Sequence, residues 1–320
     1  MGAELTWGMP VILYLFLAGV GAGAVTVSSS VLLRGGGGGF GGGHFTLARY
    51  GALMGPIPVI VGAGLIVLEL GRPFRALNLF KVINLSPMSI GSWLVLLFIG
   101  TSVFYALAFL PSFLPRLKRL SSRLAPVRGA LAWINVPLGV GVAVYTGILL
   151  GAMPSRPLWN SPILALLFMI SALSTGVATI ILARTIFHRK DSDSAVERQF
   201  YESAYLLTAT DVMLIGFELM VIFLFVMFAH LTVGNVKYAM SIILPGGDMA
   251  LMFWVWVVLI GLLLPALAEL IYVVPKLLYH RDFAAPKAIE VTVSIAVLIG
   301  GFMLRYVVVV AGQLTGPMGL

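Results

Sequence analysis

Charged residues are scarce in this chain and cysteine is missing. Of its 320 residues 10% are charged, against about 25% in an average soluble domain, and none is cysteine. Without thiolates the chain holds no cysteine-ligated iron–sulfur cluster and forms no disulfide. With 60% hydrophobic residues, the composition excludes a soluble enzyme and indicates an integral membrane protein. The net charge of +8 does not indicate nucleic-acid binding, because the basic residues lie between apolar runs.

Histidine is also too scattered to hold a haem. Two imidazoles must face each other at one depth to ligate a haem iron axially. His44 lies in a glycine-rich loop, and His188 and His280 lie among basic residues at helix ends. His230 alone ends an apolar run on the opposite side. We therefore expect no b-type haem.

Long apolar runs are what the sequence does contain. A helix of about 20 residues crosses a hydrocarbon core of about 30 Å. The runs predict an all-α membrane protein with eight transmembrane helices, at residues 9–33, 50–70, 90–110, 128–151, 161–187, 199–231, 249–279 and 286–314. An even number of spans puts both termini on one side of the membrane.

The basic residues predict which side that is, because cytoplasmic loops carry an excess of Lys and Arg. The loops and flanks after the first, third, fifth and seventh spans hold most of the 20 basic residues: Arg34, Arg49, Arg116, Lys118, Arg119, Arg123, Arg128, Arg184, Arg189, Lys190, Arg198, Lys276, Arg281 and Lys287. The opposite side holds Arg72, Arg75, Lys81, Arg156 and Lys237. Both termini are therefore expected on the periplasmic side of a bacterial or archaeal cytoplasmic membrane.

The outward loops have few charges and are rich in Pro, Trp and Met. Two of them contain "NLSPMSIGSW" and "AMPSRPLWNSP". Such loops either cap the bundle and dock a partner, or place Trp93 and Trp159 as interfacial belts at the headgroup level.

A weak internal repeat divides the sequence. "AGVGAGAVT" in the first span aligns with "SALSTGVAT" in the fifth, and Glu69 in the second span has a counterpart in Glu218 of the sixth. The pattern predicts two packed four-helix bundles of the same orientation, residues 1–155 and 156–320. Convergence is the rival explanation, because Gly and Ala recur wherever membrane helices approach closely.

Four ionisable residues lie deep in the later spans: Asp211, Glu218, Glu269 and Arg305. An isolated charge at the centre of a span costs about 2.5–3.5 kcal/mol, so each needs a reason to be there. Asp211 and Glu218 are seven residues apart and share a helix face, and Arg305 is a natural counter-charge. The cluster either handles protons or only locks the helices together.

Glu69 ends the second span in the motif "ELGRP". It either pairs locally with Arg72, three residues on, or exchanges protons at the outer surface beside an intramembrane pocket. Tyr145 and Thr146 begin "YTGILL" near the outer end of the fourth span. A quinone headgroup needs hydrogen-bond partners at its two oxygens and a nearby proton donor or acceptor, and Tyr145 with Glu69 fits that need. For Tyr145 alone, an interfacial tyrosine belt is the alternative.

The first span offers the facing wall of such a pocket. It contains "YLFLAGVGAGA", which begins with Tyr14 and includes Gly19 and Gly23. Small residues let a second backbone or a flat ring approach the helix closely.

The motifs "YLFLAGVGAGA", "ELGRP", "SPMSIGSW", "YTGILL" and "SALSTG", taken in this order, resemble the NrfD/PsrC family. Its members are integral membrane subunits of periplasmic polysulfide, thiosulfate, tetrathionate and nitrite reductases. The resemblance implies two four-helix bundles, with a menaquinone or ubiquinone site in the first bundle near the outer surface. It maps the quinone-contacting tyrosine onto Tyr145 and the ELGRP carboxylate onto Glu69. Some members carry Asn or His on the first span, where this sequence has apolar and glycine residues apart from Tyr14 and Thr26.

The resemblance also implies partners. A periplasmic iron–sulfur protein of the four-cluster, ferredoxin-like kind docks at the outer surface, and a molybdopterin or multihaem subunit carries the terminal reaction. We therefore expect the membrane subunit of a respiratory oxidoreductase, with Glu69 and Tyr145 as its reactive groups. Tyr14, Gly19, Gly23, Arg72 and Thr146 are expected to complete the quinone site. A proton-coupled secondary transporter and a passive membrane anchor of a peripheral enzyme are the alternatives.

Overall fold

The computed structural model describes residues 7–34, 43–69, 86–110, 123–187, 194–232, 234–280, 283 and 285–315. All regular structure among these residues is helical, and eight helices are long and apolar enough to cross a membrane. The helices are α1 (Met9–Arg34), α2 (Gly43–Met54), α3 (Pro56–Glu69), α5 (Pro87–Leu107), α7 (Arg128–Gly151), α8 (Pro162–Phe187), α9 (Ser194–Leu231), α10 (Asn235–Ser241), the π-helix η4 (Met252–Leu263), α11 (Leu264–Tyr279) and α12 (Lys287–Leu314). The predicted all-α membrane fold with eight spans is confirmed.

Local sequence explains several helix ends. Ser86 caps α5, because its Oγ accepts a hydrogen bond from the Ser89 backbone N–H at 3.3 Å, and Pro87 occupies the first turn. α11 ends at His280, which adopts the left-handed conformation with φ of 54°. The fourth predicted span, 128–151, coincides with α7.

The second span is longer than predicted, and two helices form it. It runs over Phe45–Glu69, with α2 and α3 meeting at Gly55 and Pro56. Pro56 has no N–H to continue the helical ladder, so the axis breaks there. A Cβ on Gly55 would overlap the Val25 side chain, and one on Gly21 would overlap Gly55 and Val59. Glycine is therefore required on both sides for α1 to contact this break.

Helices α1 and α8 form the centre of the molecule. α1 contacts α2, α3, α7 and α8, while α8 contacts α1, α7, α9 and α12. Where they cross, a Cβ on Gly23 would overlap the Ala172 carbonyl, and a Cβ on Gly176 would overlap the Gly23 backbone. This is the small-residue packing by which helices associate in lipid.

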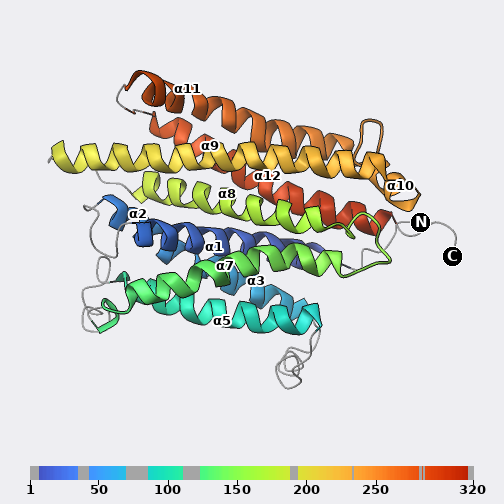
Figure 1. Cartoon of the computed structure of the whole chain (residues 1–320), viewed down its shortest axis with the longest axis horizontal. Helices are drawn as coiled ribbons and strands as arrows, with labels where there is room; N and C mark the ends of the chain where they lie inside the picture. Colours follow the sequence, from blue (N-terminus) through green and yellow to red (C-terminus); the bar gives the residue numbers. More distant parts are fainter. Residues whose placement is uncertain are drawn as a thin grey trace.

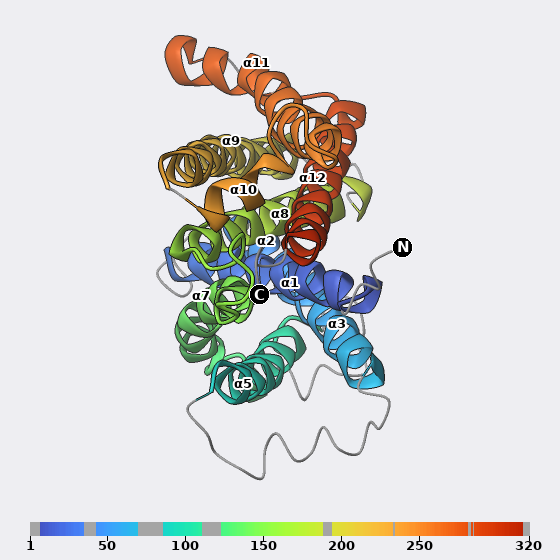
Figure 2. The same ribbon diagram turned by 90° about the vertical axis from the view of Figure 1, so that its right-hand side faces the viewer.

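The remaining helices lie on either side of this centre. α3, α5 and α7 lie on the side of α1, whereas α9, η4, α11 and α12 lie on the side of α8 (Figure 2). η4 meets α12 at Gly261 and Gly300, where a Cβ on either glycine would overlap the other backbone. Large apolar side chains such as Leu97, Trp133 and Phe223 are exposed, as expected for surfaces that face lipid.

The bundle has two distinct ends. Met9 of α1 and Leu314 of α12 lie at one of them, the terminal end, at the right of Figure 1. The other is the basic end, where α1, α5, α8 and α11 finish. Its described basic residues include Arg34, Arg128 and Arg184.

Side chains of the terminal end tie the first helix to the last. The Trp7 backbone N–H donates to Gln313 Oε1 at 2.8 Å, and Gln313 Nε2 donates to the Trp7 carbonyl at 3.1 Å. Arg156 donates to the Gln313 carbonyl at 2.7 Å, and Trp159 Nε1 donates to the Val308 carbonyl at 2.7 Å. We call these five residues the terminal clamp. The belt interpretation of Trp159 is wrong, since its side chain is 1% exposed and fills the space beside Gly312.

Candidate functional site

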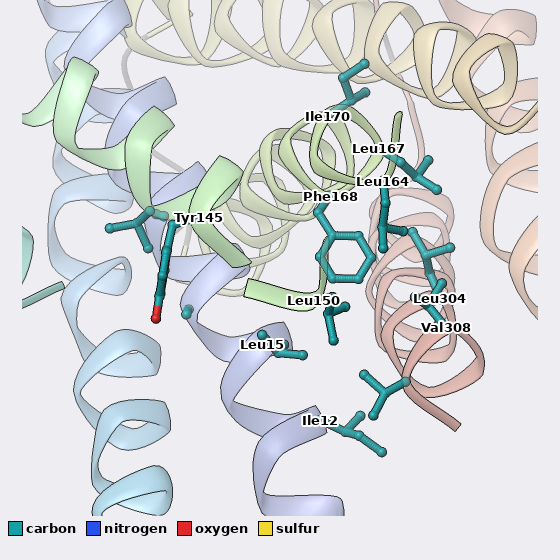
Figure 3. Close-up of a cluster of buried hydrophobic side chains, with 14 of the residues drawn as sticks. Ile12, Leu15, Tyr145, Leu150, Leu164, Leu167, Phe168, Ile170, Leu304 and Val308 are labelled. Carbon is teal, nitrogen blue, oxygen red and sulfur yellow. The ribbon is translucent and has the colours of Figure 1, made fainter. Parts of the chain in front are cut away.

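Tyr145 of α7 lies in the half of the bundle near the terminal end. Its ring covers Gly91 of α5, where a Cβ would overlap the ring itself. Figure 3 shows the Tyr145 hydroxyl directed away from the apolar group of Leu150, Phe168 and Leu304. The side chain is 8% exposed, so the phenol belongs to the interior and not to an interfacial belt.

Tyr14 of α1 is a second buried phenol near Tyr145. The two phenols are electrostatic neighbours, and Tyr14 is 7% exposed. The Tyr14 ring packs on Gly62 of α3, where a Cβ would stand 3.4 Å from it. Neither hydroxyl has a hydrogen-bond partner among the described residues. α1, α3, α5 and α7 thus place two unpaired phenols together in an apolar interior.

Glu69 lies beyond this pair, at the terminal end. It is the last residue of α3 and is exposed, with Oε1 3.8 Å from where a Cβ on Gly8 would stand. Seven residues of helix separate it from Gly62, which is about 10 Å along the axis. Arg72, its predicted partner, lies outside the described residues.

Thr146 and the two predicted glycines of α1 face other neighbours. The Thr146 hydroxyl donates to the Ala143 carbonyl of its own helix at 2.7 Å. Gly23 is covered by Ala172 of α8, and a Cβ on Gly19 would stand 3.2 Å from Arg305 Nη2. Gly19 and Gly23 therefore adjoin α12 and α8, and the Thr146 hydroxyl is bonded within α7.

The predicted ionisable cluster begins at Arg305, which is fully buried in α12. Its Nη1 donates to Ser171 Oγ at 2.5 Å and to the Gly301 carbonyl at 2.8 Å. Its guanidinium also lies over the Phe168 ring, 5.2 Å from the centroid. Glu218 of α9 is 3% exposed and lies against the Ser171 hydroxyl, within electrostatic reach of Arg305. Ser171 thus stands between the two charged groups, which form no direct ion pair.

Asp211 and Glu269 continue the cluster toward the basic end. Ser174 Oγ donates to Asp211 Oδ1 at 2.9 Å, while Asp211 Oδ2 is buried without a partner. Glu269 of α11 is an electrostatic neighbour of Asp211, and its Oε2 is likewise buried and unpaired. The structure therefore brings together all four residues predicted from the sequence. A buried carboxylate oxygen without a partner is costly when it is charged, so Asp211 and Glu269 are suited to hold a proton.

Sequence reasoning missed the ion pair that follows Glu269. Arg184 Nη2 donates to both oxygens of Glu290, at 2.9 Å to Oε1 and 2.8 Å to Oε2. The Thr185 hydroxyl donates to Oε2 at 2.6 Å. Arg184 is 1% exposed and Glu290 is 9% exposed. Arg184 lies in the last turn of α8 and Glu290 in the first turn of α12. From the sequence both residues therefore belong to the flanks of their spans and not to the buried interior.

Uncharged polar residues near the basic end were missed as well. Ser28 Oγ lies 3.2 Å from the Tyr105 hydroxyl, which is also an electrostatic neighbour of Arg128. Thr101 donates to Asn135 Oδ1 at 2.7 Å, and Asn135 Nδ2 is buried without a partner. These residues belong to α1, α5 and α7. A search restricted to charges does not find them, since each residue type is common in membrane interiors.

The helices and their buried groups define a multi-pass membrane protein with ionisable residues in its interior. The family model described as "Polysulphide reductase, NrfD" matches residues 1–317, and the chain belongs to this family. The resemblance seen in the sequence motifs is thereby confirmed.

Curated relatives cover the same length. The chain is 32% identical to "Protein NrfD" of Escherichia coli (strain K12), over 98% of this chain and 96% of that protein. It is 29% identical to "Protein NrfD homolog" of Haemophilus influenzae, over 98% and 96% of the two proteins. It is 27% identical to the C subunit of the polysulfide reductase of Wolinella succinogenes, over 97% of this protein and 95% of that one.

Proposed function

We propose that this chain is the membrane subunit of a respiratory oxidoreductase complex, which exchanges electrons between the membrane quinone pool and a periplasmic iron–sulfur subunit. The name of the Wolinella relative makes that protein one subunit of a polysulfide reductase. Membership of the same family supports a similar role for this chain, as a subunit of a reductase complex. The observation that carries the proposal is the pair of phenols, Tyr14 and Tyr145. They are buried together among four helices, with no hydrogen-bond partner among the described residues.

The pair fits a quinone headgroup, whether menaquinone or ubiquinone. A quinone presents two carbonyl oxygens in a flat ring, and each oxygen accepts a hydrogen bond. Unpaired phenol hydroxyls in an apolar interior are suitable donors. A bound quinone supplies reversible two-electron, two-proton chemistry at this position.

The protein's own residues hold the headgroup and move protons. The Tyr145 hydroxyl donates to one headgroup oxygen, and Tyr14 forms the facing wall. Glu69 exchanges protons with the outer solution, because it is exposed at the same end of the bundle. Arg72 is proposed to assist Glu69 there. Thr146, Gly19 and Gly23 set the shape of α7 and α1 behind the pair.

Electrons have no thiolate-ligated cluster on which to stay in this chain, which has no cysteine. We propose that they pass directly to a four-cluster, ferredoxin-like iron–sulfur protein docked at the terminal end. A molybdopterin or multihaem subunit then carries the terminal reaction. No haem in this chain is part of the proposal.

The proposed topology follows from the two ends of the bundle. Both termini face the periplasm, and the basic end faces the cytoplasm. We assign residues 1–155 and 156–320 to two four-helix bundles, whose central helices α1 and α8 pack against each other. The first would hold the quinone site and the second the cluster of Asp211, Glu218, Glu269 and Arg305, to which we assign proton handling. The membrane is the cytoplasmic membrane of a bacterium or archaeon.

The decisive experiment compares two activities of the purified complex. Tyr145→Phe removes one hydroxyl and keeps the ring. A lost hydrogen bond in a buried site costs about 1–3 kcal/mol, so quinol-linked turnover should fall roughly 5- to 150-fold. Glu69→Gln should lower turnover more than quinone binding, because docking needs no proton transfer. Electron transfer from an artificial donor directly to the catalytic partner should survive both changes.

Tyr306→Phe is the matched control, because Tyr306 lies on α12, on the side of α8 and not among the helices that hold the two phenols. It should keep parental quinol activity. Parental activity in Tyr145→Phe and Glu69→Gln would instead favour a passive anchor. The buried carboxylates also fit a proton-coupled transporter, and purification of the protein without any iron–sulfur partner would favour that function.

A further inference from the structure

The buried carboxylates form a series that runs along the bundle. Glu218 and Asp211 lie seven residues apart on α9, which is about 10 Å of helix. Asp211 is an electrostatic neighbour of Glu218, and Glu269 of both Asp211 and Glu290. From Arg305 to Glu290 the series follows α12 for 15 residues, which is about 22 Å. It therefore covers most of a hydrocarbon core of about 30 Å.

Glu290 is the last member of the series at the basic end. It lies in the first turn of α12, and neighbouring Lys287 is exposed. Both of its oxygens are occupied by Arg184, and Oε2 also accepts from Thr185. Asp211 and Glu269, which lie in the middle of the series, each keep one buried oxygen with no hydrogen-bond partner. Carboxylate oxygens in the middle of the series are therefore free to accept a hydrogen bond, whereas both oxygens of Glu290 are already bonded.

We propose that the Arg184–Glu290 pair is a gate that separates the carboxylate series from the solution at the basic end. This inference rests on the proton-handling part of the proposed function. While Arg184 holds Glu290, both carboxylate oxygens accept hydrogen bonds and the charge is paired, so Glu290 does not accept a proton from Glu269. When the pair opens, Glu290 takes a proton from Glu269 and releases it to the solution, and each transfer breaks one O–H bond and forms another.

Arg184 and Glu290 lie on different helices, α8 and α12, so a relative movement of these helices would open the pair. Tyr50 of α2 and Tyr201 of α9 also lie within electrostatic reach of Arg184, and both are phenols. Glu269 is the acidic group that faces Glu290 from α11. A small displacement of the last turn of α8, which carries Arg184, would move the guanidinium away from Glu290.

Passive proton flux tests the gate without quinone or partner. The full-length protein is reconstituted in liposomes containing a pH-sensitive dye, and a potassium diffusion potential drives protons inward. Arg184→Gln removes the counter-charge and should raise the flux at least about tenfold, which corresponds to a shift of about 1.4 kcal/mol in the opening equilibrium. Arg184→Gln combined with Glu290→Gln loses the same pair and also the proton carrier, so its flux should return to the parental level.

Two further variants separate a gate from a structural tie. Arg128→Gln, at the same end but on α7, removes an arginine that donates to the Ala108 carbonyl and should leave the flux unchanged. Arg184→Lys keeps the charge but loses the forked donor, so an intermediate flux is expected. If Arg184→Gln does not fold, the lysine variant with and without Glu290→Gln decides the question.

Two results would overturn the gate. One is parental flux in the single Arg184 variants, and the other is an equally high flux in the double variant. Neither result affects the quinone site, which is tested by quinol turnover in Tyr145→Phe.

Discussion

The guanidinium of Arg305 on α12 reaches the backbone of α1 at Gly19. A Cβ on Gly19 would stand 3.2 Å from Arg305 Nη2, so only glycine leaves this contact undisturbed. Arg305 also holds Ser171 of α8 and faces Glu218 of α9. Helices from both halves of the sequence therefore meet at one fully buried charge, five residues along α1 from Tyr14.

We predict that Gly19→Leu is severely destabilising, because the new side chain must displace Arg305 from Ser171. Overpacking alone costs about 1–3 kcal/mol, and a displaced buried charge adds to it. Thermal unfolding of the detergent-purified protein measures the effect. Gly64→Leu is the control, since a Cβ at exposed Gly64 meets nothing within 4 Å. Equal stability of the two variants would contradict the tight contact at Gly19.

A second prediction concerns Gly91 of α5, against which the Tyr145 ring packs. Gly91→Ala should force the ring out of its position and lower quinol-linked turnover in the same direction as Tyr145→Phe. Gly100→Ala lies on the same helix, where a Cβ meets nothing within 4 Å, and should leave turnover unchanged. Turnover of the two variants in the assembled complex is the measurement. Unchanged activity in Gly91→Ala would show that the ring position does not matter.

A third prediction concerns Asp211. Asp211→Asn keeps an oxygen to accept from Ser174 and removes the ionisable group, so assembly should persist while turnover falls by about tenfold or more. Asp248→Asn, an exposed carboxyl at the terminal end, should behave like the parent. Proton uptake and turnover of the reconstituted complex are measured together. Parental values for the Asp211, Glu218 and Glu269 amide variants would make the cluster purely structural.

The topology gives a fourth prediction. A reporter fused after Leu320 should be active if it functions only in the periplasm, and inactive if it functions only in the cytoplasm. A reporter placed after Arg34 should give the opposite result. The reverse pattern would move the proposed quinone site to the cytoplasmic surface.

Helix positions follow closely from the sequence, because apolar length alone decides where a polypeptide crosses a membrane. The predicted span 128–151 coincides with α7, and 286–314 differs from α12 by a single residue. The second span begins earlier than the predicted residue 50. It starts at Phe45, since Arg49 within the first turns interrupts the apolar run without breaking the helix.

Side-chain neighbours are harder to predict. The seven-residue spacing of Asp211 and Glu218 predicts a shared face, and both residues do face α8. Spacing does not tell which helix a residue will contact. Gly19 and Gly23, which the sequence predicts to line the quinone site, have Arg305 of α12 and Ala172 of α8 as their nearest neighbours. The environment of Trp159 could not be predicted either. The local sequence of a loop tryptophan is the same whether its side chain faces lipid or packs into the protein.

The terminal clamp also has a consequence for how the protein is made. Gln313 completes its bonds with Trp7 across 306 residues of sequence. At a synthesis rate of about 5–20 residues per second, α1 is in the membrane for roughly 15–60 s before Gln313 emerges. During that interval Trp7 lacks its two hydrogen bonds to Gln313. The clamp can therefore close only after the last span, α12, has been synthesised.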